Sequence, residues 1–395
     1  MEVHVELKTA TKFFCGCKVA FGGEPNTRVC PICLGHPGTL PVPNETAVEY
    51  ALKIALALGC EITPKSIFHR KNYFYPDMPK NYQISQYDIP IGVKGALGIQ
   101  VNGTSKLVGI TRVHIEEDTG KSIHVGGGGR LHEATHSLED FNRAGTPLVE
   151  IVTEPNINSP EEARVFAAEL RSILEFLGVS DVRMEEGSMR VDANISIAKA
   201  GERGVKTEVK NMNSLRSLQR ALVYEQDRLS KALEAGETVE QSTRHWDEKS
   251  GMTTPMRSKE FSEDYRYFPE PDLVPLEPSV ELMRQLQEEL PELPSERRGR
   301  FKQMGNSEKV SAVLGSSKWL ADFYEAAVAA AKKADPKQIG NWVANDLIGA
   351  LGERGDEPAT SKIEAAQLAE LVDLVAEGTI SNNQAKEVLV EVLES

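Results

Sequence analysis

Residues 182–213 alternate polar and apolar side chains in two short segments that a glycine-containing loop separates. The polar positions are Arg190, Asp192, Asn194 and Ser196 in the first segment and Lys206, Glu208 and Lys210 in the second. A period of two predicts half-buried strands, so we expect a β-hairpin with one apolar and one charged face. Cations, amides and carboxylates on one face suit a metal ion and a phosphorylated ligand. An ordinary solvated sheet face shows the same alternation, and spacing alone does not separate the two interpretations.

The length and charge of the chain limit the classes of protein to which it can belong. A chain of 395 residues exceeds one ordinary hydrophobic core, so two or three domains are expected. No apolar run reaches the ~20 residues that span a bilayer, and the first ten residues lack a signal-peptide core, which predicts a cytoplasmic protein without a membrane partner. The net charge of −14 disfavours a free-standing, non-specific nucleic-acid binder. It permits RNA held by a local patch or with help from partner subunits.

Four of the five cysteines form two close pairs, Cys15 with Cys17 and Cys30 with Cys33, inside the loop 15–33. Two thiolate pairs joined by a short loop predict a tetrahedral Zn²⁺ site. Four thiolates leave no open coordination position, so this zinc is expected to be structural. Two disulfides are the alternative, which a reducing cytosol disfavours. We expect Cys60, in an apolar run, to be a plain buried residue.

The first residues of the chain alternate in the same way as the hairpin. Glu2, His4, Glu6 and Lys8 alternate with Val3, Val5 and Leu7. This pattern predicts a strand over residues 2–8, and we expect the given sequence to begin in the middle of that strand. Glu2 and His4 face the same way on such a strand and are predicted to share a cation.

Three further carboxylates lie in segments that read as strands. Glu116 and Glu117 are neighbours in the sequence. Because adjacent residues of a strand face opposite ways, only one of them can enter a given pocket unless a bulge intervenes. Glu150 lies in the apolar strand expected at 148–152, where a carboxylate needs a cation or a metal as partner.

An aromatic stretch at residues 68–92 holds four of the nine tyrosines, with Arg70, Lys71 and Lys80 among them. Aromatic rings beside cations suit stacking on unpaired bases or on an adenine ring. The alternative is an irregular, aromatic-packed loop of the core, and in either case no long helix is expected. The glycine run at 125–130 lacks the Lys-Ser/Thr pair of a phosphate-binding loop and predicts a flexible loop.

Helix signals bracket these strands. Capping residues and helical spacing predict helices at about 44–58, 159–177 and 214–235. Prolines over 276–294 predict an extended linker. Residues 295–395 predict a small all-α bundle, with caps at Ser317, Asp335 and Ser381.

Seven blocks of this sequence, in order, resemble the signature blocks of the GatB family, the B subunit of the aspartyl/glutamyl-tRNA(Asn/Gln) amidotransferase. The blocks are EVHVELKT at 2–9, FHRKNYFYPDMPKNYQISQ at 68–86, HIEEDTGKS at 114–122, DFNRAGTPLVEIVTEP at 140–155, MEEGSMRVDANIS at 184–196, TEVKNMNS at 207–214 and DYRYFPEPDLVP at 264–275. The resemblance implies an α+β chain. An antiparallel-sheet cradle domain with flanking helices and the zinc loop would fill 1–275, and a helical domain with the start of a tail domain would follow the linker. It also implies apolar residues before Glu2 and a helical tail that continues beyond Ser395.

The resemblance also implies a reaction. The family uses ATP and Mg²⁺ to phosphorylate the side-chain carboxyl of Glu-tRNA(Gln) or Asp-tRNA(Asn), and ammonia from a separate glutaminase subunit then displaces the phosphate. A small third subunit joins these two in a heterotrimer. The chain itself shows no amidase-type nucleophile motif. The alternatives are a non-catalytic scaffold that only binds misacylated tRNA, and a metal-dependent phosphoryl transferase unrelated to tRNA.

By resemblance and residue chemistry, candidate roles can be assigned. The expected catalytic residues are Glu117, Glu150, Asp192, Glu208, Arg190 and Lys206. The expected Mg²⁺ ligands are Glu2, His4, Glu116, Glu117, Glu150 and Glu208. Lys71, Tyr82 and Lys210 are expected to contact the nucleotide or the acceptor end, and Asn142 and Arg143 to orient the aminoacyl end.

Overall fold

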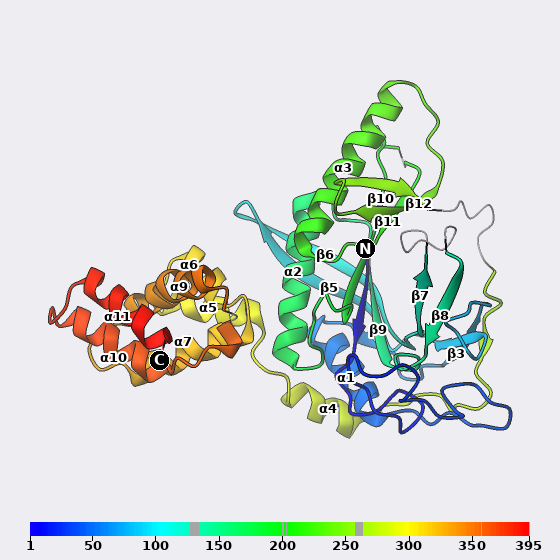
Figure 1. The fold of residues 1–395 in the computed structure, drawn as a ribbon, viewed down its shortest axis with the longest axis horizontal. Coiled ribbons are helices and arrows are strands. Elements are labelled where there is room, and N and C mark those ends of the chain that lie inside the picture. Colours follow the sequence, from blue (N-terminus) through cyan, green and yellow to red (C-terminus); the bar gives the residue numbers. More distant parts are fainter. Residues whose placement is uncertain (127–133, 200, 203, 257–263, 357, 395) are drawn as a thin grey trace. The chain divides into compact units, whose positions relative to one another are not determined.

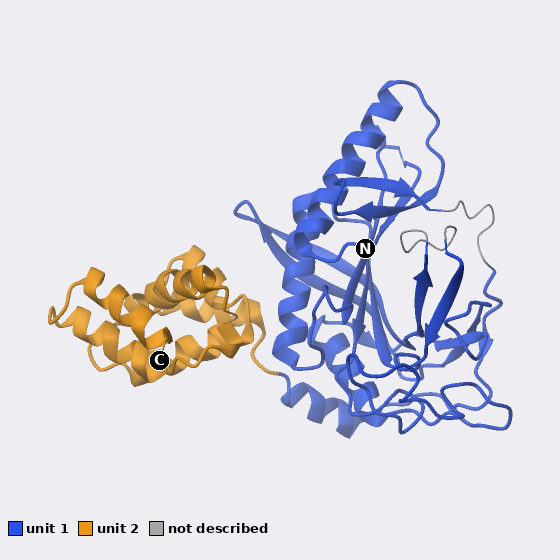
Figure 2. Ribbon diagram, in the orientation of Figure 1, with its two compact units in different colours: residues 1–290 blue, residues 291–395 orange. Residues whose placement is uncertain are grey.

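The computed structural model describes residues 1–126, 134–199, 201–202, 204–256, 264–356 and 358–394. The chain divides into two compact units, Met1–Leu290 and Pro291–Ser395 (Figure 2). Within the described residues, no helix has the length and the apolar content needed to cross a membrane.

A nine-stranded sheet forms the centre of the first unit (Figure 1), in the order β13-β12-β11-β10-β1-β9-β6-β5-β2. Its strands are β1 (Glu2–Glu6), β2 (Glu61–Ile62), β5 (Gly92–Val101), β6 (Thr104–Glu117), β9 (Pro147–Thr153), β10 (Met189–Ile195), β11 (Thr207–Lys210), β12 (Ser242–Asp247) and β13 (Met252–Pro255). Neighbouring strands are antiparallel except β11 and β12, which are parallel. The expectation of a wholly antiparallel sheet is therefore wrong at one junction. Its cause is the helical crossover between these two strands, which returns the chain to the same end of the sheet.

The predicted hairpin is confirmed as β10 and β11. Asn194 lies opposite Glu208, and the apolar side chains Val191, Ala193 and Val209 are buried while the charged ones are partly exposed. The first strand is shorter than the predicted 2–8, since β1 ends at Glu6. It lies between β9 and β10 in the middle of the sheet.

Three helices cover the apolar face of the sheet. They are α1 (Glu45–Ala57), α2 (Pro160–Leu177) and α3 (Leu215–Glu234). Asn44, Ser159 and Ser214 cap them, as the sequence predicts, because each side chain accepts a hydrogen bond from a main-chain N–H of the first turn. Helix α1 contacts β6, α2 contacts β5 and α3 contacts β10. These contacts leave the polar face of the central strands free to form a site.

Two smaller sheets complete the first unit. The strands β3 (His69–Asn72), β4 (Tyr82–Ser85) and β14 (Phe268–Pro269) form one, and β7 (Lys121–Val125) and β8 (His136–Asp140) form the other. The absence of a long helix from the described aromatic stretch is confirmed. The sequence pattern does not predict the β7–β8 hairpin, and most of the glycine run at 125–130 lies outside the described residues.

The prediction of an extended linker over 276–294 is wrong. Residues 280–288 form helix α4 (Val280–Glu288), which Ser279 caps. Leu286 is buried, and Glu289 forms an ion pair of 2.8 Å with Lys53 on α1. The prolines flank this helix instead of interrupting it, so the first unit extends to Leu290.

The second unit is the predicted helical bundle. Its helices are α5 (Pro294–Gln303), α6 (Glu308–Leu314), α7 (Lys318–Ala330), α8 (Pro336–Asn341), α9 (Ile348–Arg354), α10 (Ala365–Ala376) and α11 (Asn382–Glu394), with a π-helical turn (Trp342–Leu347) before α9 and a short 3₁₀ turn (Pro358–Thr360) after it. The predicted caps Ser317, Asp335 and Ser381 are confirmed.

Candidate functional site

A row of charged side chains crosses the polar face of the sheet. The strand register places His114 opposite Glu150, Glu150 opposite His4, and His4 opposite Arg190. These four residues belong to β6, β9, β1 and β10, which are adjacent in the sheet. Directly opposed residues of antiparallel strands have neighbouring side chains, so four segments far apart in the sequence converge here.

Three of these strands supply an inner group, defined as His4, Glu116, Glu150 and His114. His4 Nε2 lies 3.5 Å from a Glu150 oxygen and 3.8 Å from a Glu116 oxygen. Ligands of an octahedral ion with bonds near 2.1 Å are about 3 to 4 Å apart, so His4, Glu116 and Glu150 fit one Mg²⁺. His114 Nε2 lies 3.0 Å from the same Glu150 oxygen that lies 3.5 Å from His4, so both histidines hold this carboxylate.

The charges of the inner group shift the pKa values of its own members. Burial opposes the charged form of His114, but the carboxylates of Glu150 and Glu116 outweigh it and raise the pKa of His114 to about 9. Burial also opposes ionisation of Glu150, but His114 and His4 hold the pKa of this carboxyl well below its usual range. Glu150 is therefore an anion at neutral pH, the form that binds a metal.

A second set of carboxylates, the outer group, consists of Glu2, Asp192 and Glu208. One oxygen from each lies within 4.8 Å of the other two. Lys210 Nζ lies 2.9 Å from Asp192 and 3.1 Å from Glu208. Asn194 donates a hydrogen bond of 3.2 Å to Glu2. The outer group thus offers oxygen ligands for a cation, and the Lys210 ammonium beside them could contact a phosphate.

The expectation that Glu2 and His4 share a cation is not met. They do face the same way, but two residues of a strand span about 6.8 Å, so each joins a different group.

A set of charges around the buried Asp118 lies next to His4, and the sequence names two of its members, Arg190 and Arg143, but does not predict that Asp118 joins them. Arg190 donates to Asp118 at 2.9 Å, and Arg143 Nε lies 3.6 Å from the same carboxylate. Burial opposes ionisation, but the two arginines lower the pKa of Asp118 to about 2. Burial and the Asp118 charge raise the pKa of Glu6 to about 8. The alternation of the first strand points to Glu6, whereas no sequence signal connects Asp118 with Arg190.

Glu117 belongs to neither carboxylate group. It falls on the face of Val113 and Ile115, as the alternation predicts, and accepts hydrogen bonds from Lys80 Nζ and from the main-chain N–H of Ile84. Its expected role as a ligand of the same ion as Glu116 does not fit this position. Glu117 instead lines a cavity of about 240 Å³, which residues of the cysteine loop also line.

Two of the candidates, Lys71 and Tyr82, belong to the small β14-β3-β4 sheet. Lys71 Nζ is 5.0 Å from the Tyr265 ring, and its charge contributes to lowering the pKa of Glu116, which burial opposes. Tyr82 lies between Arg70 and Lys80, at 4.3 and 5.5 Å from its ring centre. Lys206 is exposed just before β11. The charge of Lys71 therefore acts on the inner group.

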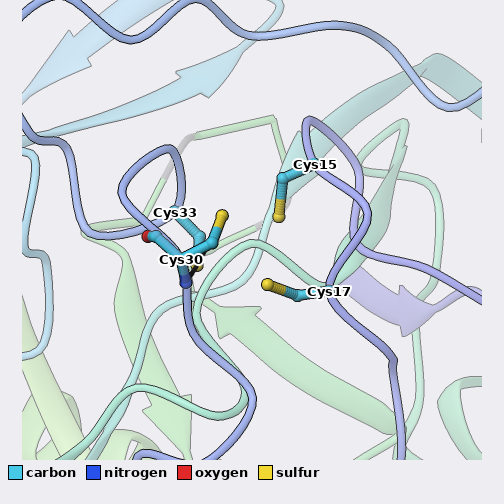
Figure 3. Close-up of side chains that lie close together, drawn as sticks. All are labelled: Cys15, Cys17, Cys30 and Cys33. Carbon is cyan, nitrogen blue, oxygen red and sulfur yellow. Dashed lines mark hydrogen bonds between the residues drawn. The ribbon is translucent and has the colours of Figure 1, made fainter.

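The four cysteine sulfurs converge as predicted (Figure 3). All four lie within 4.8 Å of one another, and those of Cys30 and Cys33 are 3.9 Å apart. A tetrahedral site with Zn–S bonds of 2.3 Å requires sulfurs about 3.8 Å apart, so the cluster fits a zinc ion. No cysteine of the chain is in a disulfide. A hydrogen bond from Cys15 and the charge of Lys12 lower the pKa of Cys33 to about 4, although burial opposes this.

The cysteine loop is tied to the turn that precedes β9. Asn142 accepts a hydrogen bond of 2.8 Å from Arg28 N and donates one of 2.7 Å to Glu24 O. Asn26 makes two further hydrogen bonds to the main chain of the same turn, at Glu139 and Phe141. Asn142 is buried, and its amide group makes these hydrogen bonds to the cysteine loop. This position does not favour the expected role of orienting the aminoacyl end.

We expect Asn142→Ala to act on stability. Losing two partly buried hydrogen bonds should lower the free energy of unfolding of the first unit by about 1–3 kcal/mol, with the KM for the substrate unchanged. Thermal melting and steady-state kinetics measure the two quantities. A raised KM with unchanged melting would instead support the orienting role.

The fold and the site define an α+β protein whose sheet carries carboxylate groups suited to metal-dependent phosphate chemistry, followed by a helical unit. Residues 1–284 match the family model of the GatB/GatE catalytic domain, and residues 322–395 match that of the GatB domain. The chain belongs to the GatB family, that of the B subunit of aspartyl/glutamyl-tRNA(Asn/Gln) amidotransferases, which confirms the resemblance seen in its sequence.

Relatives named as the B subunit of an aspartyl/glutamyl-tRNA(Asn/Gln) amidotransferase are similar over about four fifths of their own length. The protein of Moorella thermoacetica is 52% identical over 100% of this chain and 82% of its own. Those of Frankia casuarinae and Carboxydothermus hydrogenoformans are 51% and 50% identical over 100% of this chain, and over 79% and 82% of their own.

Proposed function

We propose that this chain is the subunit that activates misacylated tRNA for amidation. It would transfer the γ-phosphate of ATP to the side-chain carboxyl of Glu-tRNA(Gln) or Asp-tRNA(Asn), and ammonia from a glutaminase subunit would then displace the phosphate. The observation that supports this most directly is the pair of carboxylate groups on one polar face, with Lys210 in contact with the outer group and Arg190 opposite His4.

The chemistry explains the residue types. A carboxylate is a poor acyl donor because oxide is a poor leaving group, and phosphorylation replaces it with phosphate. A Mg²⁺ ion held by the carboxylates of this face would supply positive charge to the phosphate. The inner group would hold such an ion through His4, Glu116 and Glu150, and the outer group offers a second candidate set of ligands in Glu2, Asp192 and Glu208. Lys210 and Arg190 would hold the phosphate oxygens by charge-assisted hydrogen bonds.

The positions of other residues suggest supporting roles. His114 fixes Glu150, and Asp118 fixes Arg190, so the side chains that would meet the ligands are held before binding. Tyr87 and Tyr267 stack with ring centres 4.2 Å apart near Glu116 and Glu150, which favours contact of this aromatic surface with the acceptor end of the tRNA. The four-cysteine cluster would hold a structural zinc.

Glu208→Gln tests the metal role of the outer group. Replacing an anionic ligand with a neutral amide should raise the Mg²⁺ concentration for half-maximal amidation by about 10- to 100-fold, with activity partly restored at high Mg²⁺. The measurement is the rate of Gln-tRNA formation against Mg²⁺, with the glutaminase and the small third subunit present.

One control variant sharpens this test. Glu202→Gln, in the exposed loop of the same hairpin, should leave the Mg²⁺ dependence unchanged. A non-catalytic scaffold would show equal Mg²⁺ dependence in all three proteins, which would contradict the proposal.

A further inference from the structure

Lys12 is a buried lysine between β1 and the cysteine loop. Its side chain is fully buried. Its ammonium donates to Cys33 Sγ at 3.6 Å and to the carbonyl oxygen of Phe141 at 3.1 Å. Within the described part of the chain, no carboxylate oxygen lies within 4.0 Å of this ammonium.

Such an ammonium needs a negative partner. Burying an unpaired charge is costly, and a carbonyl supplies a hydrogen bond but no charge. The sulfur of Cys33 is the only other group to which Lys12 Nζ donates among the described residues. A divalent ion with four thiolates has a formal charge of −2. The metal-bound cluster would therefore be the negatively charged partner of the Lys12 ammonium.

The need is reciprocal. Cys33 is buried, whereas Cys15, Cys17 and Cys30 are partly exposed and can reach water. The Cys33 sulfur also accepts from the main-chain N–H of Cys30 at 3.2 Å. Of the four sulfurs, it is therefore the one whose charge the protein must balance internally.

We propose that Lys12 is the charge partner of the metal–thiolate centre and positions Cys33 within it. The proposal rests on the zinc of the proposed function and not on the proposed reaction. Groups that hydrogen-bond to metal ligands commonly contribute 10- to 100-fold to metal affinity.

Lys12 also joins the cysteine cluster to the turn at residues 141–145, which precedes β9. Its bond to Phe141 O, and the bond of 2.8 Å from Phe13 N to Gly145 O, hold both ends of residues 141–145. That turn carries Arg143, which contacts Asp118. The Lys12 side chain thus links the cysteine cluster to the turn whose Arg143 contacts Asp118.

The experiment measures zinc affinity of the full chain by competition with a chromophoric chelator. Lys12→Met should bind zinc about 10- to 100-fold more weakly, because it keeps the apolar stem and removes the charge. Lys12→Arg should retain most of the affinity. The control is Lys8→Met, whose lysine is 63% exposed and paired with Asp181, and this variant should match the wild type.

A second readout separates charge from folding. In the cobalt-substituted protein, loss of the nearby cation should raise the energy of the sulfur electrons, so the thiolate-to-cobalt band of Lys12→Met should move to longer wavelength with four thiolates still bound. If this variant does not fold, Lys12→Gln replaces it, and weaker zinc binding than in Lys12→Arg supports the proposal.

Three results would overturn the proposal. They are unchanged affinity and spectrum in the neutral variants, equal losses in the neutral and Arg variants, or an equal loss in Lys8→Met. A wild-type protein that binds no zinc would overturn both this proposal and the structural zinc, whereas zinc binding without any amidation activity would contradict only the proposed reaction.

Discussion

Replacing Glu150 with glutamine is expected to lower the rate of ATP-dependent phosphate transfer to misacylated tRNA by about 100- to 1,000-fold, with tRNA binding retained. Glutamine keeps the size of the side chain and removes its charge. Glu150 lies closer to both histidines of the inner group than Glu116 does, at 3.5 Å from His4 and 3.0 Å from His114, against 3.8 Å from each for Glu116. The substitution would therefore remove a proposed metal ligand and leave the two imidazoles with the more distant carboxylate of Glu116.

The matched control is Glu154→Gln. Glu154 follows β9 by one residue, is exposed, and accepts a hydrogen bond from Thr111 outside both carboxylate groups. This variant should retain near wild-type rates. A Glu150→Gln enzyme that amidates Glu-tRNA at the normal rate would show that the inner group is structural and would favour the scaffold alternative.

Replacing Cys33 with serine is expected to have the largest effect on the structure. Zinc content should fall from about one ion per chain to essentially none, since a hydroxyl is a poor ligand and three thiolates do not close the tetrahedron. Because a structural zinc contributes folding energy directly, the loop 15–33 should become open to proteolysis. Buried Lys12 then also loses its charge partner.

The effect should reach the active site. Hydrogen bonds of Asn26 and Asn142 hold the loop against the end of β8 and the turn at 141–145, and Arg143 in that turn contacts Asp118. Phosphate transfer should therefore fall together with zinc content. Metal analysis, limited proteolysis and kinetics on the same preparation test this.

Cys60→Ser is the control, since Cys60 is buried outside the loop. It should keep its zinc. Full activity of a zinc-free Cys33→Ser protein would show that the loop does not support the site.

The elements of this fold were largely predictable where the pattern is local. Alternation over 190–210 identified β10 and β11, and the caps Ser159 and Ser214 marked two helices, because these signals depend on residues a few positions apart. The helix α4 was missed because its flanking prolines dominated a short apolar pattern.

The site was less predictable because it depends on which strands are neighbours. β1 pairs with β9 and with β10, whose residues follow it by about 150 and 190 positions. Periodicity gives the face of a side chain and not its cross-strand partner. It placed Glu116 and Glu117 correctly on opposite faces, yet it could not separate Glu2 from His4 or bring Asp118 to Arg190.

The most direct test of the proposed function uses ATP labelled in its γ-phosphate. The chain is incubated with Mg²⁺, Glu-tRNA(Gln) and the two proposed partner subunits, without glutamine or another ammonia source. We predict phosphate release that depends on the misacylated tRNA and is lost in Glu150→Gln. If the complete complex binds the tRNA and leaves ATP intact, the assignment of phosphate activation to this polar face is wrong.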